Sequence, residues 1–137
     1  NKNILFLCTG NSCRSQLAEG LAKKYLKNHL IKSAGTNPDP INPLAIKVMD
    51  EIGIDISNNS SKMYLDSDIE NANLIITLCG DAKDHCISNY NFKDKHIHWN
   101  IKDPAKSKGS NAKLLDVFRQ TRNIIEKQIK LLSKEII

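Results

Sequence analysis

The amino-acid sequence predicts an α/β fold, with a single domain over residues 1–137 in which helices flank a four-stranded parallel sheet. Three observations support this prediction. Short apolar runs alternate along the chain with longer segments of helical periodicity. The apolar runs are continuous, which is typical of parallel strands that are buried on both faces. A chain of 137 residues also buries roughly two thirds of its unfolded surface, so one core is sufficient without disulfide bonds.

Residues 3–8 form the first predicted strand, because Ile4 to Leu7 is an unbroken apolar run. The helix predicted next, over residues 14–29, repeats its apolar residues at intervals of three and four and leaves lysines on the opposite face. Residues 31–34 then form a short strand that ends at Gly35.

A loop containing two prolines, residues 36–40, separates that strand from a helix predicted over residues 43–52. Asn42 is a favourable N-cap and Pro43 is a favourable first residue for this helix. Gly53 is expected to end it.

The second half of the chain supplies the remaining strands. Residues 58–61 are polar and predict a turn without chemistry of its own. Residues 74–79 form the clearest second buried strand, and residues 96–99 form the fourth, followed by a loop over residues 102–105. The last helix is predicted over residues 111–135, because its apolar residues fall on one stripe.

The loop between the first strand and the first helix carries the clearest functional signal. Five residues separate Cys8 from Arg14, and a helix begins at once. Backbone N–H groups at a helix N-terminus point inward and, together with the helix dipole, favour an anion. The loop is therefore predicted to bind phosphate or another tetrahedral oxyanion. The expected oxyanion-binding residues are Thr9, Gly10, Asn11, Ser12, Cys13, Arg14 and Ser15.

Each reactive side chain of the loop has an expected role. The helix N-terminus and Arg14 should lower the pKa of Cys8 from about 8.5 toward roughly 4–7 and so produce a thiolate. Arg14 offers a planar fork for two oxyanion oxygens. Ser15 is expected to donate to the Cys8 sulfur, and Cys13 is expected to pack beneath Arg14.

The carboxyl ends of three predicted strands lead to Cys8, Cys79 and Asp103. Ligands of open α/β sheets bind at this edge, so these side chains are predicted neighbours. Two alternatives remain for the later cysteines. In the first, Cys79 is a buried strand residue and Cys86 is a surface residue. In the second, a zinc site forms. The zinc site would draw on Cys79, His85, Cys86, His96 and His98.

The formal charge of +5 comes entirely from the end of the chain. Residues 1–101 contain 11 basic and 11 acidic residues, whereas residues 102–137 contain 9 and 4. In the last helix Lys127, Lys130 and Lys134 alternate with apolar residues at helical spacing, so we interpret them as its solvated face. No nucleic-acid function is expected.

No apolar run approaches the roughly 20 residues that a membrane span requires, and no basic-then-apolar leader precedes the first strand. Two of the four cysteines lie in the oxyanion loop, which indicates chemistry more than a secreted disulfide framework. A soluble cytoplasmic protein without membrane contact is therefore expected.

The loop Cys8 to Gln16, the strand end Ser33-Ala34-Gly35 and the pair Asp103-Pro104 resemble the low-molecular-weight tyrosine phosphatase fold over nearly the whole chain. Within that fold, the loop and Thr77-Leu78-Cys79 with Cys86 closely resemble the thioredoxin-coupled arsenate reductases. The resemblance implies that Cys8 is the nucleophile, that Cys79 and Cys86 form a disulfide relay, and that Asp103 supplies acid catalysis.

The resemblance implies reduction of arsenate to arsenite by a monomer that thioredoxin regenerates, with arsenic detoxification as its role. Thioredoxin and glutaredoxin both remain open as reductants. Phosphate and sulfate are expected to compete for the loop, with weak phosphatase activity as a side reaction. No organic cofactor is expected.

Two alternative functions remain. A low-molecular-weight protein tyrosine phosphatase needs Cys8, Arg14 and Asp103 but no second thiol, and it also needs aromatic walls for a phenyl ring. In phosphatases of this fold aromatic residues follow the Asp-Pro pair, whereas Ala105-Lys106-Ser107 follow it here. A redox-sensing oxyanion binder, without catalysis, is the second alternative.

Members of the resembled family can bind a potassium ion beside the loop. The positions that match are Asn11, Glu19, Ser33 and Asp66. The segment before Asp66 is one residue longer than the family pattern. Local hydrogen bonding is the alternative interpretation of Glu19 and Ser33.

Overall fold

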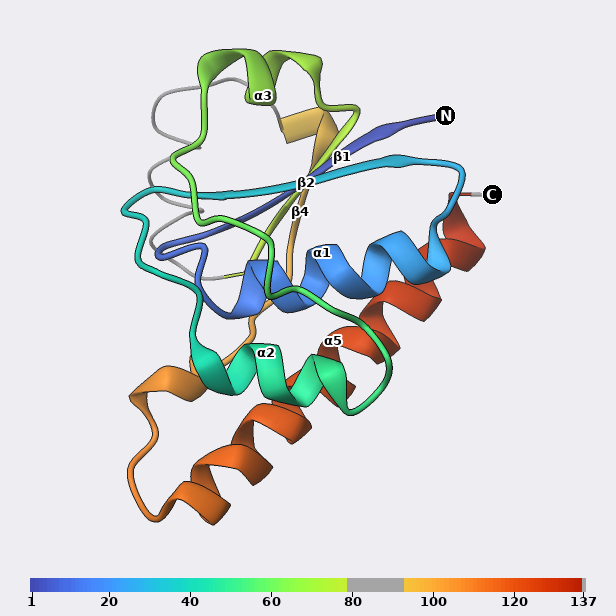
Figure 1. Cartoon of the computed structure of the whole chain (residues 1–137). Coiled ribbons are helices and arrows are strands. Elements are labelled where there is room, and N and C mark those ends of the chain that lie inside the picture. The colour runs from blue at the N-terminus through green and yellow to red at the C-terminus, as the bar shows by residue number, and fades with distance from the viewer. Residues whose placement is uncertain (79–92, 137) are drawn as a thin grey trace.

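The computed structural model describes residues 1–78 and 93–136 of the chain (Figure 1). Parallel strands and helices alternate along it, as predicted. The elements are β1 (Asn3–Cys8), α1 (Arg14–Tyr25), β2 (Leu30–Gly35), α2 (Pro43–Asp50), α3 (Asp66–Asn71), β3 (Leu74–Thr77), β4 (His96–His98) and α5 (Asn111–Glu135), with 3₁₀ turns at Lys93–Lys95 and Pro104–Lys106.

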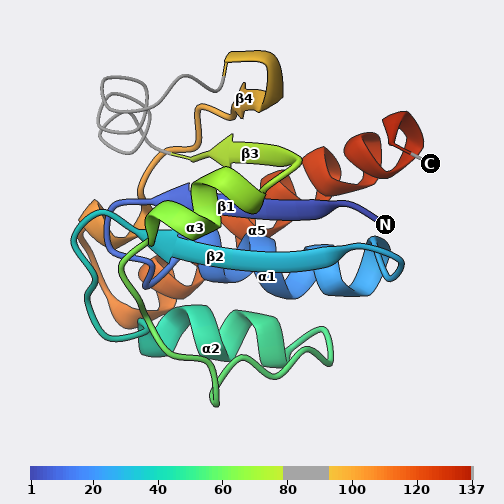
Figure 2. The same cartoon turned by 90° about the horizontal axis from the view of Figure 1, so that it is seen from above.

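The four strands form one sheet in the order β2-β1-β3-β4, and every pairing is parallel. The predicted four-stranded parallel sheet is therefore confirmed. Figure 2 shows the strands side by side in this order, with β1 and β3 inside the sheet. Because all strands run the same way, their carboxyl ends meet at one edge.

Helices cover both faces of the sheet. Figure 1 shows α1, α2 and α5 on one side of it and α3 on the other. Strand β1 serves both cores: Ile4 and Phe6 pack in the larger core with α1 and α5, whereas Leu5 and Leu7 pack in the smaller core beneath α3. This two-sided burial explains why the apolar run of β1 is continuous. Cys8 continues the Phe6 face toward α1.

Two predicted helices end earlier than expected. Helix α1 ends at Tyr25, because Leu26 leaves helical geometry (φ −120°, ψ 52°) and is buried. Helix α2 ends at Asp50, and a turn then reaches Gly53, which has a φ of +77°. A left-handed residue of this kind favours glycine and prevents the helix from continuing.

The sequence did not predict α3. This helix has six residues, and Ile69 is its only buried one, so it carries no apolar periodicity. Its first turn is capped by Asp68, whose carboxylate accepts a hydrogen bond from Leu65 N at 2.8 Å.

Helix α5 agrees with its prediction in bounds and in its buried stripe, which includes Phe118, Ile125 and Ile129. Lys127 and Lys130 on its other side are exposed, as expected of a solvated face. Within residues 1–78 and 93–136, no helix combines the length and apolar character needed to cross a membrane.

The loop after β1 is supported along its length by the segment that follows β2. Backbone N–H groups of residues 36–42 donate to four carbonyls between Cys8 and Ser12, at 2.8–3.2 Å. The pairs are Thr36 N to Cys8 O, Asn37 N to Thr9 O, Asp39 N to Gly10 O and Asn42 N to Ser12 O. The proline-containing loop is therefore a rigid backing for the oxyanion loop.

Gly35 permits this close approach. A Cβ atom at position 35 would lie 2.5 Å from Thr9 O and 2.9 Å from Asn11 N, both backbone atoms that cannot turn away. We expect Gly35→Ala to lower the free energy of unfolding by about 2–3 kcal/mol, as overpacking does, and to weaken phosphate binding. Thermal unfolding and phosphate titration measure these two effects.

Gly20→Ala is the matched control. Its Cβ would meet Met49 Cε at 2.7 Å and the Cγ2 methyls of Ile54 and Ile56 at 3.1 and 3.2 Å. All three are side-chain atoms, the nearest is the end of a flexible side chain, and alanine favours the helix. A smaller loss of stability with unchanged phosphate affinity is expected. Equal phosphate affinity of wild type and Gly35→Ala would contradict the prediction that phosphate binding depends on this close approach.

Candidate active site

The candidate site lies where β1 ends and α1 begins. Cys8 is the last residue of β1, and Arg14 is the first residue of α1. Between them Asn11 adopts a left-handed backbone conformation (φ 47°), which turns its N–H toward the Cys8 sulfur at 3.3 Å. The loop therefore wraps around the thiol, while its binding of an oxyanion remains a prediction.

A directed chain of hydrogen bonds ends on the Cys8 sulfur. Asn11 Nδ2 donates to Ser15 Oγ at 2.8 Å and to Ser33 Oγ at 3.0 Å, and Ser33 Oγ donates to Glu19 Oε1 at 2.8 Å. Ser15 Oγ lies 2.8 Å from Cys8 Sγ, and when Cys8 is a thiolate the hydroxyl must be the donor of this bond, because the thiolate has no hydrogen. The expected Ser15 donor is thus in place, and Asn11 sets its direction.

Asn11 also accepts hydrogen bonds from residues that the sequence did not predict to belong to the site. Its side-chain oxygen accepts from Lys62 N at 3.0 Å and from Gln16 Nε2 at 3.2 Å, and its carbonyl accepts from Ser61 Oγ at 2.8 Å. Asn59 in turn donates to Glu19 at 3.1 Å. The prediction that residues 58–61 are only a turn is therefore wrong, because this turn fixes the loop.

Burial raises the pKa of the Cys8 thiol above its ordinary value, because desolvation disfavours the thiolate. Hydrogen bonds from Ser15 and from Asn11 N, and the charge of Arg14, act in the opposite direction. The predicted low pKa is contradicted, since that prediction considered the helix and Arg14 but not the burial of a side chain that is 2% exposed. The donors to the sulfur thus decide how much thiolate forms.

Ser15→Ala tests this dependence. Removing the hydroxyl takes away the largest influence that lowers the Cys8 pKa, so less thiolate exists at neutral pH. We expect the rate of Cys8 alkylation at pH 7 to fall roughly tenfold or more, since a hydrogen bond to a charged group contributes about 1.5–3 kcal/mol. The pH profile should move to higher pH. Ser61→Ala, which loses a bond to Asn11 O and none to sulfur, should leave the profile in place.

Arg14 joins the loop to the ends of two other strands. Its Nη1 donates to Ile101 O at 2.9 Å and to Leu78 O at 3.4 Å, and its Nη2 lies 3.6 Å from Asp103 Oδ2. These contacts fix the guanidinium plane at the carboxyl edge of the sheet. Binding of an oxyanion by its fork remains a prediction.

Asp103 faces the same space from the loop after β4. Its Oδ1 accepts a hydrogen bond from Ala105 N at 3.0 Å and caps the turn Pro104–Lys106. Its side chain is 23% exposed. The structure thus brings Asp103 to Cys8 and Arg14, as predicted from the strand ends.

These residues surround a cavity of about 510 Å³. The loop contributes Cys8, Thr9, Gly10, Ser12, Cys13 and Arg14 to its lining. The other lining residues are Asp39, Lys102, Asp103, Ala105 and Lys106. Over the described parts of the chain, the lining contains no aromatic ring.

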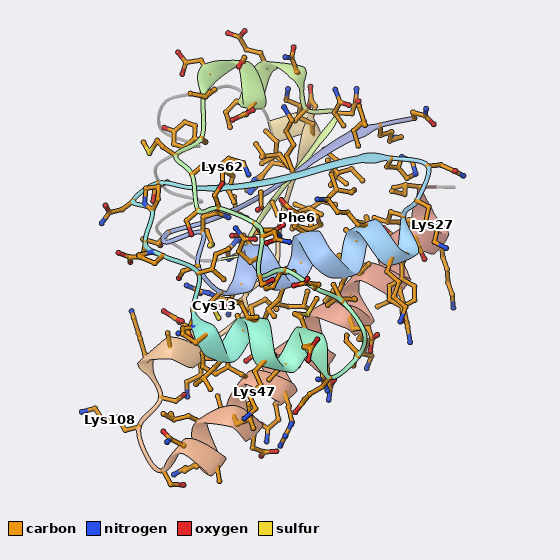
Figure 3. The ribbon with its side chains drawn as sticks, in the orientation of Figure 1. Phe6, Cys13, Lys27, Lys47, Lys62 and Lys108 are labelled. Atoms are coloured by element: carbon orange, nitrogen blue, oxygen red, sulfur yellow. The ribbon has the colours of Figure 1, made fainter. Side chains whose placement is uncertain are left out.

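Cys13 is 4% exposed and lies at the junction of α1 and α2 (Figure 3). Burial and the nearby Asp103 and Cys8 raise the pKa of its thiol, so Cys13 stays protonated. The expected packing role agrees with this environment.

The remaining predicted cysteines, Cys79 and Cys86, lie outside the described residues, as does His85 of the alternative zinc site. The other two zinc candidates both contact Thr77 Oγ1, His96 through Nε2 at 2.8 Å and His98 through Nδ1 at 2.7 Å. Residues 1–78 and 93–136 contain no group of three or more His, Cys, Asp or Glu side chains arranged for a metal ion.

Three of the four positions matched to a potassium site come together. Asn11, Ser33 and Glu19 form the hydrogen-bonded chain, so the local bonding offered as an alternative is present. Asp66 lies in the exposed first turn of α3, and the cavity beside Glu19 is lined by Asp68 instead.

Comparison with known proteins places this site in a family. Residues 3–137 match the low molecular weight phosphotyrosine protein phosphatases. The chain is 47% identical over 130 residues to an arsenate reductase of Halalkalibacterium halodurans, which covers 94% of the chain and 93% of that relative.

Solved structures that share the fold include phosphatases and an arsenate reductase. A low molecular weight protein tyrosine phosphatase from T. tengcongensis superposes with a TM-score of 0.84 and 30% identity over 98% of this chain and 99% of that one. An arsenate reductase in the phosphate binding state superposes with a TM-score of 0.79 and 30% identity over 100% of both chains. The chain therefore belongs to the low molecular weight phosphotyrosine protein phosphatase family, and a bacterial arsenate reductase is among its relatives.

Proposed function

We propose that the protein reduces arsenate to arsenite through the thiol of Cys8. One observation carries the proposal: Cys8, Arg14 and Asp103 line one cavity whose described walls contain no aromatic ring. Such a cavity suits a free tetrahedral oxyanion better than a phenyl ester. The 47% identity to an arsenate reductase supports the same substrate.

In the first step the Cys8 thiolate attacks arsenic, forming a sulfur–arsenic bond as one arsenic–oxygen bond breaks. Asp103 gives its proton to the departing hydroxyl group of the arsenate, which leaves as water. The Arg14 fork and the N–H groups of the loop bind the remaining oxygens. Ser15 and Asn11 stabilise the sulfur before the attack.

In the second step the Cys79 thiolate attacks the Cys8 sulfur. A Cys8–Cys79 disulfide forms, the electron pair of the sulfur–arsenic bond passes to arsenic, and arsenite leaves. The Cys86 thiolate then attacks Cys79, which frees Cys8 and leaves a Cys79–Cys86 disulfide. Thioredoxin, as an external dithiol, reduces that disulfide and is itself oxidised.

Tyrosine phosphatase activity is the second candidate, since a tyrosine phosphatase is 30% identical and shares the fold. It requires a wall for the phenyl ring, where this chain has Lys102, Ala105 and Lys106. We therefore expect aryl phosphates to react slowly and inorganic phosphate to inhibit arsenate reduction competitively.

A potassium ion beside the loop is also part of the proposal. Ser33 and Glu19 offer hard oxygen atoms of the kind that hard cations prefer, whereas Asn11 turns its amide nitrogen toward Ser33 and the position of Asp66 does not fit. A bound ion would supply positive charge next to Glu19. The Asn11 amide orients Ser15 whether or not the ion is present.

The Cys86→Ser variant tests the relay. Without Cys86, no thiol of the chain is present to attack the Cys8–Cys79 disulfide. One arsenite per chain should therefore form before the reaction stops. Mass analysis should then find Cys8 linked to Cys79. Sustained turnover of Cys86→Ser with thioredoxin would contradict the relay, and release of no arsenite by wild type would contradict the proposed function itself.

A further inference from the structure

Two lysines belong to the wall of the cavity that holds Cys8. Lys102 and Lys106 both line the cavity, one on each side of the Asp103–Ala105 segment, and both are exposed. Their positions follow from the turn Pro104–Lys106, which Asp103 caps through Ala105 N. We call Lys102 and Lys106 the rim lysines.

Among the described residues, the rim lysines lack the fixed anionic partner that several other cations of the chain have. Lys23, Lys32 and Arg119 form ion pairs with Glu19, Asp68 and Glu51. Within residues 1–78 and 93–136, neither Lys102 nor Lys106 forms such a pair.

The cavity has an excess of positive charge because of these two residues. Arg14, Lys102 and Lys106 supply three cations against the carboxylates of Asp39 and Asp103. Asp103 already lies 3.6 Å from Arg14. Without the rim lysines the lining would have no net positive charge to favour the entry of an anion into the loop.

We propose that Lys102 and Lys106 capture the substrate electrostatically and select doubly charged tetrahedral oxyanions. The inference rests on the proposed function and names the feature that brings arsenate to Cys8. The rim lysines act through their charge at the cavity mouth, while the loop and Arg14 hold the anion at the sulfur. They raise the local concentration of the dianion and the rate at which it enters.

Charge capture has a quantitative signature. The Coulomb energy between a lysine and an anion is proportional to the anion's charge. A substitution that weakens binding of a tetrahedral monoanion by a given factor should weaken binding of a dianion of similar shape by about the square of that factor. Sulfate and perchlorate form such a pair at neutral pH.

The experiment measures how each anion protects Cys8 from alkylation by neutral iodoacetamide, with the Cys8 peptide quantified by mass spectrometry. The variants are Lys102→Gln, Lys106→Gln and the double variant. Lys108→Gln is the control, because it removes the same charge from the exposed loop before α5, where Lys108 points away from the cavity (Figure 3). Protection needs no redox chemistry, so it tests the rim lysines even if arsenate is not reduced.

Each rim substitution should raise the sulfate dissociation constant about three- to tenfold at roughly 0.1 M ionic strength and should affect perchlorate less. Most of the effect should disappear near 1 M NaCl, where the Debye length is about 3 Å. With arsenate as substrate, each rim substitution should lower kcat/KM more than it lowers kcat. Lys108→Gln should resemble wild type.

Two results would overturn the inference. One is that Lys102→Gln and Lys106→Gln bind sulfate as tightly as Lys108→Gln does. The other is a loss of affinity that is equal for sulfate and perchlorate, or one that persists at 1 M NaCl. Either outcome would indicate a short-range contact instead of charge capture. Both results are compatible with arsenate reduction by wild type, so they leave the proposed function standing.

Discussion

Cys8→Ser should abolish arsenate reduction, with a loss of at least roughly 10⁴-fold in kcat, because a serine hydroxyl neither attacks arsenic as a thiolate does nor forms a disulfide. The hydroxyl is close in size to the thiol and can keep the hydrogen bond with Ser15, so the fold and phosphate binding should persist. Arsenite release in the presence of thioredoxin measures the activity, and phosphate titration checks the site.

Cys13→Ser is the matched control for this prediction. Cys13 belongs to the same loop, but its thiol is buried in the core and protonated. We expect a loss of about 1–2 kcal/mol in the free energy of unfolding, as a buried hydroxyl replaces a thiol, with arsenate reduction retained. Loss of activity from Cys13→Ser as complete as that from Cys8→Ser, in a folded protein, would contradict the role given to Cys8.

Arg14→Lys should lower kcat/KM for arsenate by about 10²–10³-fold, the usual effect of losing a group that stabilises an oxyanion. A lysine has no planar fork, so it cannot donate to Leu78 O and Ile101 O and also bind two oxygens of the substrate. Phosphate affinity should fall together with activity. Steady-state kinetics and phosphate titration provide both numbers.

Arg119→Lys tests whether any arginine change has this effect. Arg119 binds Glu51 through Nε and Nη2, far from the cavity lining, so its replacement should leave the kinetics unchanged. If Arg14→Lys also retained wild-type kcat/KM, the guanidinium would have no part in oxyanion binding.

The sequence predicted those features that depend on residues close together in the chain. The unbroken apolar run before Cys8, the spacing to Arg14 and the immediate start of a helix are local signals, and the structure shows that loop. The meeting of Cys8 with Asp103 also follows from local signals, because parallel strands bring their carboxyl ends to one edge.

The support of Asn11 could not be predicted in this way. Ser61 Oγ reaches the Asn11 carbonyl across 50 positions in the sequence, and no spacing rule connects a polar turn to a distant loop. The raised pKa of Cys8 could not be predicted for a similar reason. Burial by the folded chain raises this pKa, and the adjacent residues do not. Helix α3 was missed because its six residues bury only Ile69.

The most direct measurement is a map of disulfides after a single turnover. The wild-type protein is mixed with arsenate in the absence of reductant, quenched with acid and alkylated, and its cysteine peptides are identified by mass spectrometry. The proposed relay predicts one arsenite per chain, a Cys79–Cys86 disulfide, and reduced Cys8 and Cys13. Cys79 and Cys86 that both stay reduced, in a protein that rapidly hydrolyses a phenyl phosphate ester, would contradict it.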